Sequence, residues 1–212
     1  MTKLSLYKFG GYFVCKSATV GTIYSTCDSF SFDFFPGVYI LRGEIDSGAW
    51  AVASSLIKHK NTKQNVYDLE SKVVYNNMYI PQNYICNIAH SLDQRNVTHI
   101  TVKQQIKKNI KKNKLSISLD KFQEIFQIDN QRFSRTIRCV GNEIYNCNAA
   151  IGYAKKKEVF SFPWISLKKY NYLCNRIHFL CETLDKLGCI VLLPVSASVP
   201  LSEFNNRGYD VL

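Results

Sequence analysis

Gly43 and Gly48 are separated by four residues and lie between an apolar run and a segment of helical pattern. This spacing is typical of a phosphate-binding loop, whose backbone N–H groups hold an anion at the start of a helix. In such a loop a lysine follows the second glycine and contacts the phosphates, and the next residue carries a hydroxyl that binds Mg²⁺. Here Ala49 and Trp50 occupy these two positions. The sequence therefore predicts the outline of a phosphate-binding loop that lacks its cation and its metal ligand.

The segments around this loop fit the role of holding it. Pro36–Gly37 predicts a turn, residues 38–41 form an apolar run typical of a buried strand, and residues 49–57 have the pattern of a helix. A strand, a glycine-bounded loop and a helix are the layout that places backbone N–H groups around an anion. Farther upstream we expect strands at 4–9 and 12–14, flanking a turn at Gly10–Gly11, and a strand at 29–35.

The remaining chain alternates predicted strands with predicted helices, which indicates an α/β core. Residues 101–138 carry helical patterns without strands, so we expect a helical subdomain there. Ser118 is placed to cap its second helix. The expected strands are 73–75, 78–80, 159–162 and 189–193, and the expected helices are 101–112, 119–127, 143–154 and 168–187.

Segments spread along the chain resemble, in order, the motifs of one family. Ser31–Leu41 is similar to the strand pair that leads into a Walker A loop, and Tyr79–Gln82 is similar to a segment ending in a Q-loop glutamine. Further similar segments are Ile100–Ile106, Cys139–Glu143, Ile151–Glu158, Val159–Trp164, Gly188–Leu193 and Val195–Ala197. Over nearly its whole length the chain resembles the ATP-binding subunit of ABC transporters.

The resemblance implies site positions, most of which have lost the residues that the family uses. The Walker B Asp–Glu pair falls either on Phe162–Pro163 or on Pro163–Trp164, and no histidine follows His178 to serve as the switch. We therefore expect no catalytic residue, no metal ligand and no bound cofactor, with weak ATP binding without Mg²⁺ left open. The implied positions are Gly43, Ser47, Gly48, Ala49 and Trp50 (Walker A), Gln82 (Q-loop), Cys139, Val140, Gly141, Asn142 and Glu143 (signature), Phe162, Pro163 and Trp164 (Walker B), and Ser196 and Ala197 (switch).

The resemblance also implies the fold. It is the α/β fold of P-loop NTPases, in a single cassette domain that spans residues 1–212. Residues 1–100 and 139–212 would form the α/β core, which begins with an antiparallel β subdomain. Residues 101–138 would be the inserted helical subdomain.

The function that follows from the lost motifs is that of a pseudo-ATPase. Phosphoryl transfer depends on charge neutralisation by the loop lysine and by Mg²⁺, whereas the loop N–H groups and helix dipole alone supply about 1 kcal/mol. An inactive subunit would pair with a second, active cassette and dock on membrane permease subunits at the cytoplasmic face of the cell membrane. By family analogy it would serve the export of peptides or antimicrobial compounds.

Two other functions stay open, and the second of them follows from the formal charge of +11. One is a nucleotide-binding or residually active ABC ATPase. The other is a basic adaptor or nucleic-acid-binding protein, which would use the lysines between 103 and 114; few aromatic residues lie among them for base stacking, and solvated faces often carry such runs. The eight cysteines form no C-x-x-C pair and predict buried free thiols in place of a metal site. No apolar stretch is long enough to span a membrane, and the first residues do not resemble a signal peptide.

Overall fold

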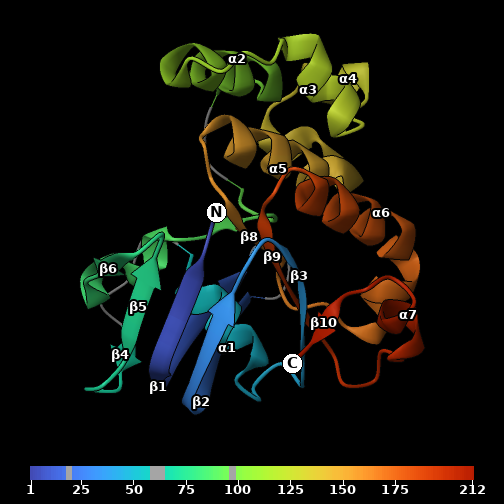
Figure 1. Ribbon diagram of the computed structural model, residues 1–212. Coiled ribbons are helices and arrows are strands. Elements are labelled where there is room, and N and C mark those ends of the chain that lie inside the picture. The colour runs from blue at the N-terminus through green and yellow to red at the C-terminus, as the bar shows by residue number, and fades with distance from the viewer. Residues whose placement is uncertain (18–20, 58–64, 96–98) are drawn as a thin grey trace.

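The computed structural model describes residues 1–17, 21–57, 65–95 and 99–212 and contains two sheets (Figure 1). The first sheet is antiparallel, in the order β2-β1-β5-β6, with β4 also paired to β1. The second is parallel throughout, in the order β10-β3-β9-β8-β7. This confirms the predicted α/β class with an antiparallel N-terminal part. The strands are β1 Leu4–Ser17, β2 Gly21–Phe34, β3 Gly37–Arg42, β4 Val66–Tyr67, β5 Lys72–Tyr75, β6 Met78–Ile80, β7 His90–Ser91, β8 Val159–Ser161, β9 Ile190–Val195 and β10 Asp210–Val211.

The strands β3 and β9 form the centre of the parallel sheet. Their registered pairs run from Gly37 opposite Ile190 to Arg42 opposite Val195, and all of β9 is buried. Both faces of the sheet are covered, which is why these strands are continuous apolar runs without polar alternation. Val38 and Ile40 face one core, whereas Tyr39 and Leu41 face the other.

The helix α1, Ala49–Ser55, lies between the two sheets. Its buried residues share a core with side chains of β1 and β2 on one side and of β3 and β9 on the other. Ala51 and Ala53 are completely buried, and their small side chains allow close packing against strands on both sides. The loop that precedes α1 is thereby fixed between two sheets.

The predicted turn at Gly10–Gly11 is wrong, because both glycines lie inside the continuous strand β1. The register of β1 against β2 shifts between Leu6 and Phe9 and again between Phe9 and Gly11, as at a β-bulge. A Cβ atom on Gly11 would lie 2.2 Å from the carbonyl oxygen of Val66. These glycines therefore permit the close approach of the β4 segment, and they do not reverse the chain.

The helices α2, α3 and α4 form a group beyond α5, at the end of the molecule remote from the antiparallel sheet (Figure 1). Thr101 and Gln104 form a capping box at the start of α2, and Ser118 caps α3 as predicted. Phe122, Phe126 and Phe133 are buried in one core with α5. The bounds are α2 Val102–Asn113, α3 Leu119–Ile125, α4 Asn130–Phe133, α5 Ile144–Ala154, α6 Leu167–Lys186 and α7 Ser202–Asn205, with 3₁₀ helices η2 Gln82–Asn87, η3 Ile137–Cys139 and η4 Gly141–Glu143.

All eight cysteines are free, but they are not uniformly buried. Cys139 is exposed, and Cys27 and Cys174 are half-buried, so burial accounts for only five of the eight. Among the helices that the structure describes, none combines the length and the apolar character needed to cross a membrane.

Candidate functional site

The predicted phosphate-binding loop connects the carboxyl end of β3 to the start of α1. Gly43 N–H donates to the carbonyl of Val195 (2.9 Å), which ties the loop to the neighbouring strand β9. Ser47 folds back on the loop, since both its N–H (3.1 Å) and its hydroxyl (2.8 Å) donate to the carbonyl of Glu44. Gly48 has a φ of 92°, a left-handed conformation that favours glycine. The loop is closed by its own hydrogen bonds.

Trp50 is a core residue. Its side chain is 1% exposed and packs with residues of the antiparallel sheet, so no hydroxyl or other polar ligand stands at this position. Ala49, at the position of the lysine, is half-buried and presents only a methyl group. Helix α1 is seven residues long, which limits the dipole that could act on an anion at its start.

Three of the predicted motifs meet at the loop. The indole N–H of Trp164 donates to the carbonyl of Gly43 (3.0 Å), and the hydroxyl of Ser196 donates to a carboxylate oxygen of Glu44 (3.3 Å). The guanidinium of Arg42 donates to the carbonyl of Ala197. They meet because β3, β8 and β9 are parallel neighbours, so that the residues after their carboxyl ends reach the same edge of the sheet. We call this edge the loop edge, defined by Arg42–Gly48, Pro163–Trp164 and Ser196–Ala197.

The charges at the loop edge do not favour a phosphate. Glu44 and Asp46 are exposed carboxylates within the loop, whereas the only basic side chain in the segment 42–50 is Arg42. Its guanidinium is already bound to the carbonyl of Ala197. At the predicted Walker B positions, Phe162 and Pro163 are buried and Trp164 is half-buried. The loop edge thus has the layout of a phosphate site and the charge of an anion-repelling surface.

A cavity of about 350 Å³ lies beside the loop, between β2 and α1. The walls of this cavity are mostly apolar. Burial raises the pKa of the Cys27 thiol to about 11, so this thiol stays neutral near pH 7. The lining residues include Cys27, Phe30, Phe32, Phe34, Ala49 and Val52.

Gln82 lies apart from the loop edge. It is exposed at the start of η2 and follows β6, which belongs to the antiparallel sheet. The outermost strand of the parallel sheet is instead β7, and Gln94 follows it by three residues. Asn148 fixes this segment by donating to the carbonyls of Leu92 (2.9 Å) and Gln94 (3.0 Å). Gln94 was not predicted, because the strand before it has only two residues and shows no periodicity in the sequence.

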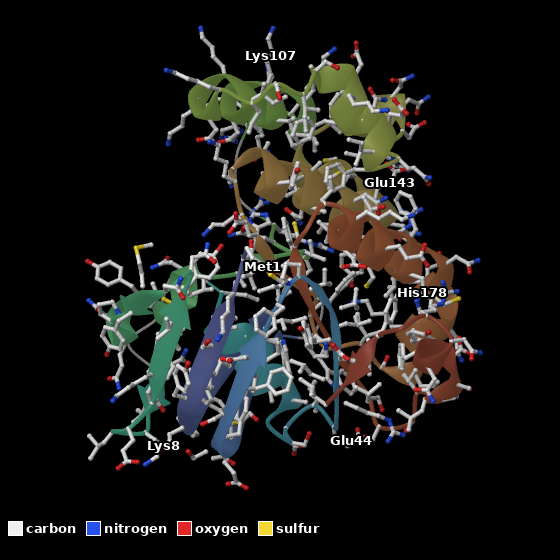
Figure 2. The ribbon with its side chains drawn as sticks, viewed as in Figure 1. Met1, Lys8, Glu44, Lys107, Glu143 and His178 are labelled. Carbon is white, nitrogen blue, oxygen red and sulfur yellow. The ribbon has the colours of Figure 1, made fainter. Side chains whose placement is uncertain are left out.

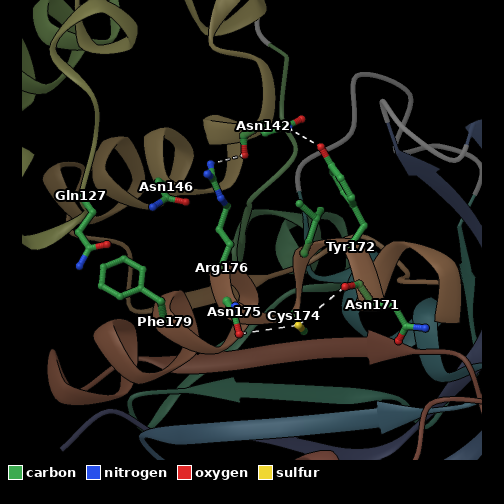
Figure 3. Close-up of a pocket in the computed structure, with 10 residues that line it drawn as sticks. Gln127, Asn142, Asn146, Asn171, Tyr172, Cys174, Asn175, Arg176 and Phe179 are labelled. Carbon is green, nitrogen blue, oxygen red and sulfur yellow. Dashed lines mark hydrogen bonds between the residues drawn. The ribbon is translucent and has the colours of Figure 1, made fainter.

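The predicted signature segment, Cys139–Glu143, precedes α5. Val140 is completely buried, and the carboxylate of Glu143 accepts a hydrogen bond from the N–H of Asp129 (3.0 Å). The carbonyl of Asn142 accepts a hydrogen bond from Arg176 (2.7 Å), and the side-chain amide of Asn142 donates to the hydroxyl of Tyr172 (3.1 Å). These residues line a polar cavity of about 510 Å³ (Figure 3). Within the described residues these hydrogen bonds reach the α4 region and α6, and none reaches the loop edge.

The sequence and the structure were compared with those of known proteins. No family model matches the sequence, and neither does the sequence of any curated protein. A protein from Pyrococcus furiosus, described as an ABC-transporter ATP-binding protein, is similar in structure with a TM-score of 0.59 and 11% identity, covering 99% of this chain and 97% of its own. A dimeric ATP-binding cassette with bound ADP and phosphate has a TM-score of 0.59 and 12% identity, over 94% of this chain and 89% of that one.

A bacterial Atm1-family ABC exporter with ATP bound is also similar, with a TM-score of 0.56 and 13% identity. The match covers all of this chain and 37% of the exporter chain. Identities this low show the fold alone. The chain has the fold of an ATP-binding cassette of ABC transporters.

Proposed function

We propose that this chain is a catalytically inactive subunit of an ABC transporter, which pairs with an active cassette and docks on membrane permease subunits. The observation that carries the proposal is the loop edge. Trp164 donates to Gly43 there and Ser196 donates to Glu44, but the positions that need a cation, a metal-binding carboxylate and a histidine hold apolar or uncharged residues.

The chemistry of phosphoryl transfer supports inactivity. The reaction is catalysed by positioning the nucleotide and by neutralising charge that spreads over the phosphoryl oxygens. Electrostatic groups in a closed site contribute several kcal/mol of transition-state stabilisation, and a metal ion contributes a similar amount. Ala49, which follows the loop at the lysine position, supplies no charge, whereas Glu44 within the loop adds a negative one.

The remaining role is structural. The proposed subunit would complete a dimer with the active cassette, offering its segment Cys139–Glu143 to the partner's nucleotide. It would pass movement to the permease through Gln82 or Gln94 and through residues 101–138. One of the similar structures is a dimer and another is an exporter, and these two properties are part of our proposal for this chain. The transported compounds we assign to it are peptides or antimicrobial compounds.

Nucleotide measurements test inactivity. We expect the purified chain to show no ATP turnover above background and no Mg²⁺-dependent binding of labelled ATP. Micromolar affinity that requires Mg²⁺ would contradict the proposal. Purification from native membranes tests the assembly: recovery with a permease and a second cassette is expected, and recovery as a lone monomer would contradict it.

Residual ATP binding without Mg²⁺ is a second candidate, favoured by the cavity beside the loop. Phe30 and Phe32 line this cavity and offer aromatic faces on which a base could stack. Phe30→Ala should then weaken ATP and ADP equally, because the contact would involve the base. An affinity that tracks phosphate number would contradict stacking.

A further inference from the structure

The basic charge of the chain is concentrated in its helical part. Residues 101–138 contain ten lysine and arginine residues and three carboxylates, so they carry +7 of the total +11. Helix α2 contains no acidic residue. The charge of the molecule is therefore displaced to the end that lies farthest from the antiparallel sheet (Figure 1).

The lysines of α2 occupy one half of the helix surface. At 100° per residue, the buried Val102, Gln105 and Ile106 lie on one side and the lysines lie on the opposite side. The side chain of Lys107 extends away from the molecule (Figure 2). We call this the lysine face; its members, all exposed, are Lys103, Lys107, Lys108, Lys111, Lys112 and Lys114.

No member of the lysine face forms an ion pair with a carboxylate among the residues that the structure describes. The four described ion pairs involve other basic residues, including Lys121 with Glu124 on the neighbouring helix α3. Five ammonium groups on α2 and one at its C-cap repel one another, and nearby negative charge from outside the chain would relieve that repulsion.

We propose that the lysine face binds the anionic headgroups of a phospholipid bilayer. A lysine ammonium is a compact point charge on a flexible stem, which suits a diffuse layer of phosphates, whereas bidentate recognition of one phosphate uses arginine. The face carries no large apolar side chain, because Val102 and Ile106 are buried, so contact is electrostatic and at the membrane surface.

Nucleic acid is the less favoured anion. Single-stranded nucleic acid is bound by aromatic side chains that stack on bases. The aromatic residues in the segment 101–138 are Phe122, Phe126 and Phe133, and all three are buried. The lipid proposal requires neither a permease nor a partner cassette, so vesicles made of lipid alone can test it.

The test is flotation of the full chain with vesicles, one set of phosphatidylcholine alone and one set with about one third phosphatidylserine. We expect binding to the anionic vesicles only, and release at about 0.5 M salt. Replacing Lys103, Lys107 and Lys111 by glutamine should weaken binding roughly 100-fold, since each lysine near such a surface contributes about fivefold. Replacing the same three by arginine should preserve binding and shows that the effect is one of charge.

A matched control changes three exposed lysines elsewhere, Lys72, Lys168 and Lys186, to glutamine and removes the same net charge. We expect it to bind almost as the unmodified chain does. An equal loss in the control, or equal binding to neutral vesicles, would overturn the proposal. So would failure to bind vesicles at all combined with salt-sensitive binding to RNA or DNA, which would assign the lysine face to nucleic acid.

Discussion

The loop edge and the lysine face differ in how charge is used. At the loop edge, hydrogen bonds and packing maintain the geometry of a phosphate site, but Arg42, the basic side chain there, already donates to the carbonyl of Ala197. On the lysine face six cationic groups are exposed along the outer side of a helix and at its C-cap. The geometry of a binding site and its charge can therefore be lost separately. The geometry of the loop edge depends on the core, whereas the charge of the lysine face depends on solvent-exposed positions.

Substitution of Trp50 should have the largest effect, and it tests whether the geometry of the loop edge depends on the core. We expect Trp50→Ala to lower the free energy of unfolding by about 3–5 kcal/mol, because it removes a fully buried indole from the core between the sheets. Urea denaturation measures the loss. A change below about 1 kcal/mol would show that this position is not structural and would reopen a role in ligand binding.

His90 should make the stability of the core depend on pH. Burial, together with the charges of Lys155 and Lys157, lowers the pKa of His90 to about 3. The unfolded chain binds this proton below about pH 6.5 and the folded chain does not, so stability falls as the pH falls from there, by about 1.4 kcal/mol per pH unit. His90→Leu should flatten the dependence by that amount between about pH 6 and pH 4. Identical slopes for the two proteins in urea denaturation would contradict the buried neutral imidazole.

Trp164 tests the contact that joins two motifs at the loop edge. Trp164→Phe removes the N–H that donates to the carbonyl of Gly43, and we expect a loss of about 1 kcal/mol in the free energy of unfolding. Tyr79→Phe is a suitable control, because it also removes one polar group, from an exposed tyrosine whose hydroxyl has no hydrogen bond within the described residues. Equal effects of the two substitutions would mean that the indole contact does not stabilise the loop.

Ala49→Lys should have the smallest effect. It restores the cation of a phosphate-binding loop at a half-buried position, but Pro163 and Trp164 still provide no metal-binding carboxylate. We expect no ATP turnover and a change in stability within about 0.5 kcal/mol. Turnover above the level of the unmodified chain would show that the loop edge retains catalytic groups that the proposal denies.

Much of the architecture was predictable, because its long elements carry strong patterns. The apolar runs at β3 and β9, the loop between Gly43 and Gly48, and the serine cap of α3 could all be identified from the sequence. The two-residue strands β7 and β10 could not, because two residues show no periodicity and their position depends on pairing with β8 and β3.

The same limit affected the candidate site. Gln82 follows a clear strand pattern, but whether that strand joins the parallel or the antiparallel sheet depends on long-range pairing. Gln94 follows a strand too short to predict. The contacts of Trp164 with Gly43 and of Ser196 with Glu44 also required the fold, although the positions themselves were predicted.

The pairing of β3 has a consequence for the order of folding. Gly37 pairs with Ile190 on one side of this strand, and Tyr39 pairs with Asp210 on the other, so both neighbours are distant in sequence. The β1–β2 hairpin, by contrast, closes between adjacent segments. Closing long stretches of chain is slow, because entropy is lost before the contacts form. During synthesis both edges of β3 therefore stay unpaired until β9 emerges, and for that time the strand can pair with another chain.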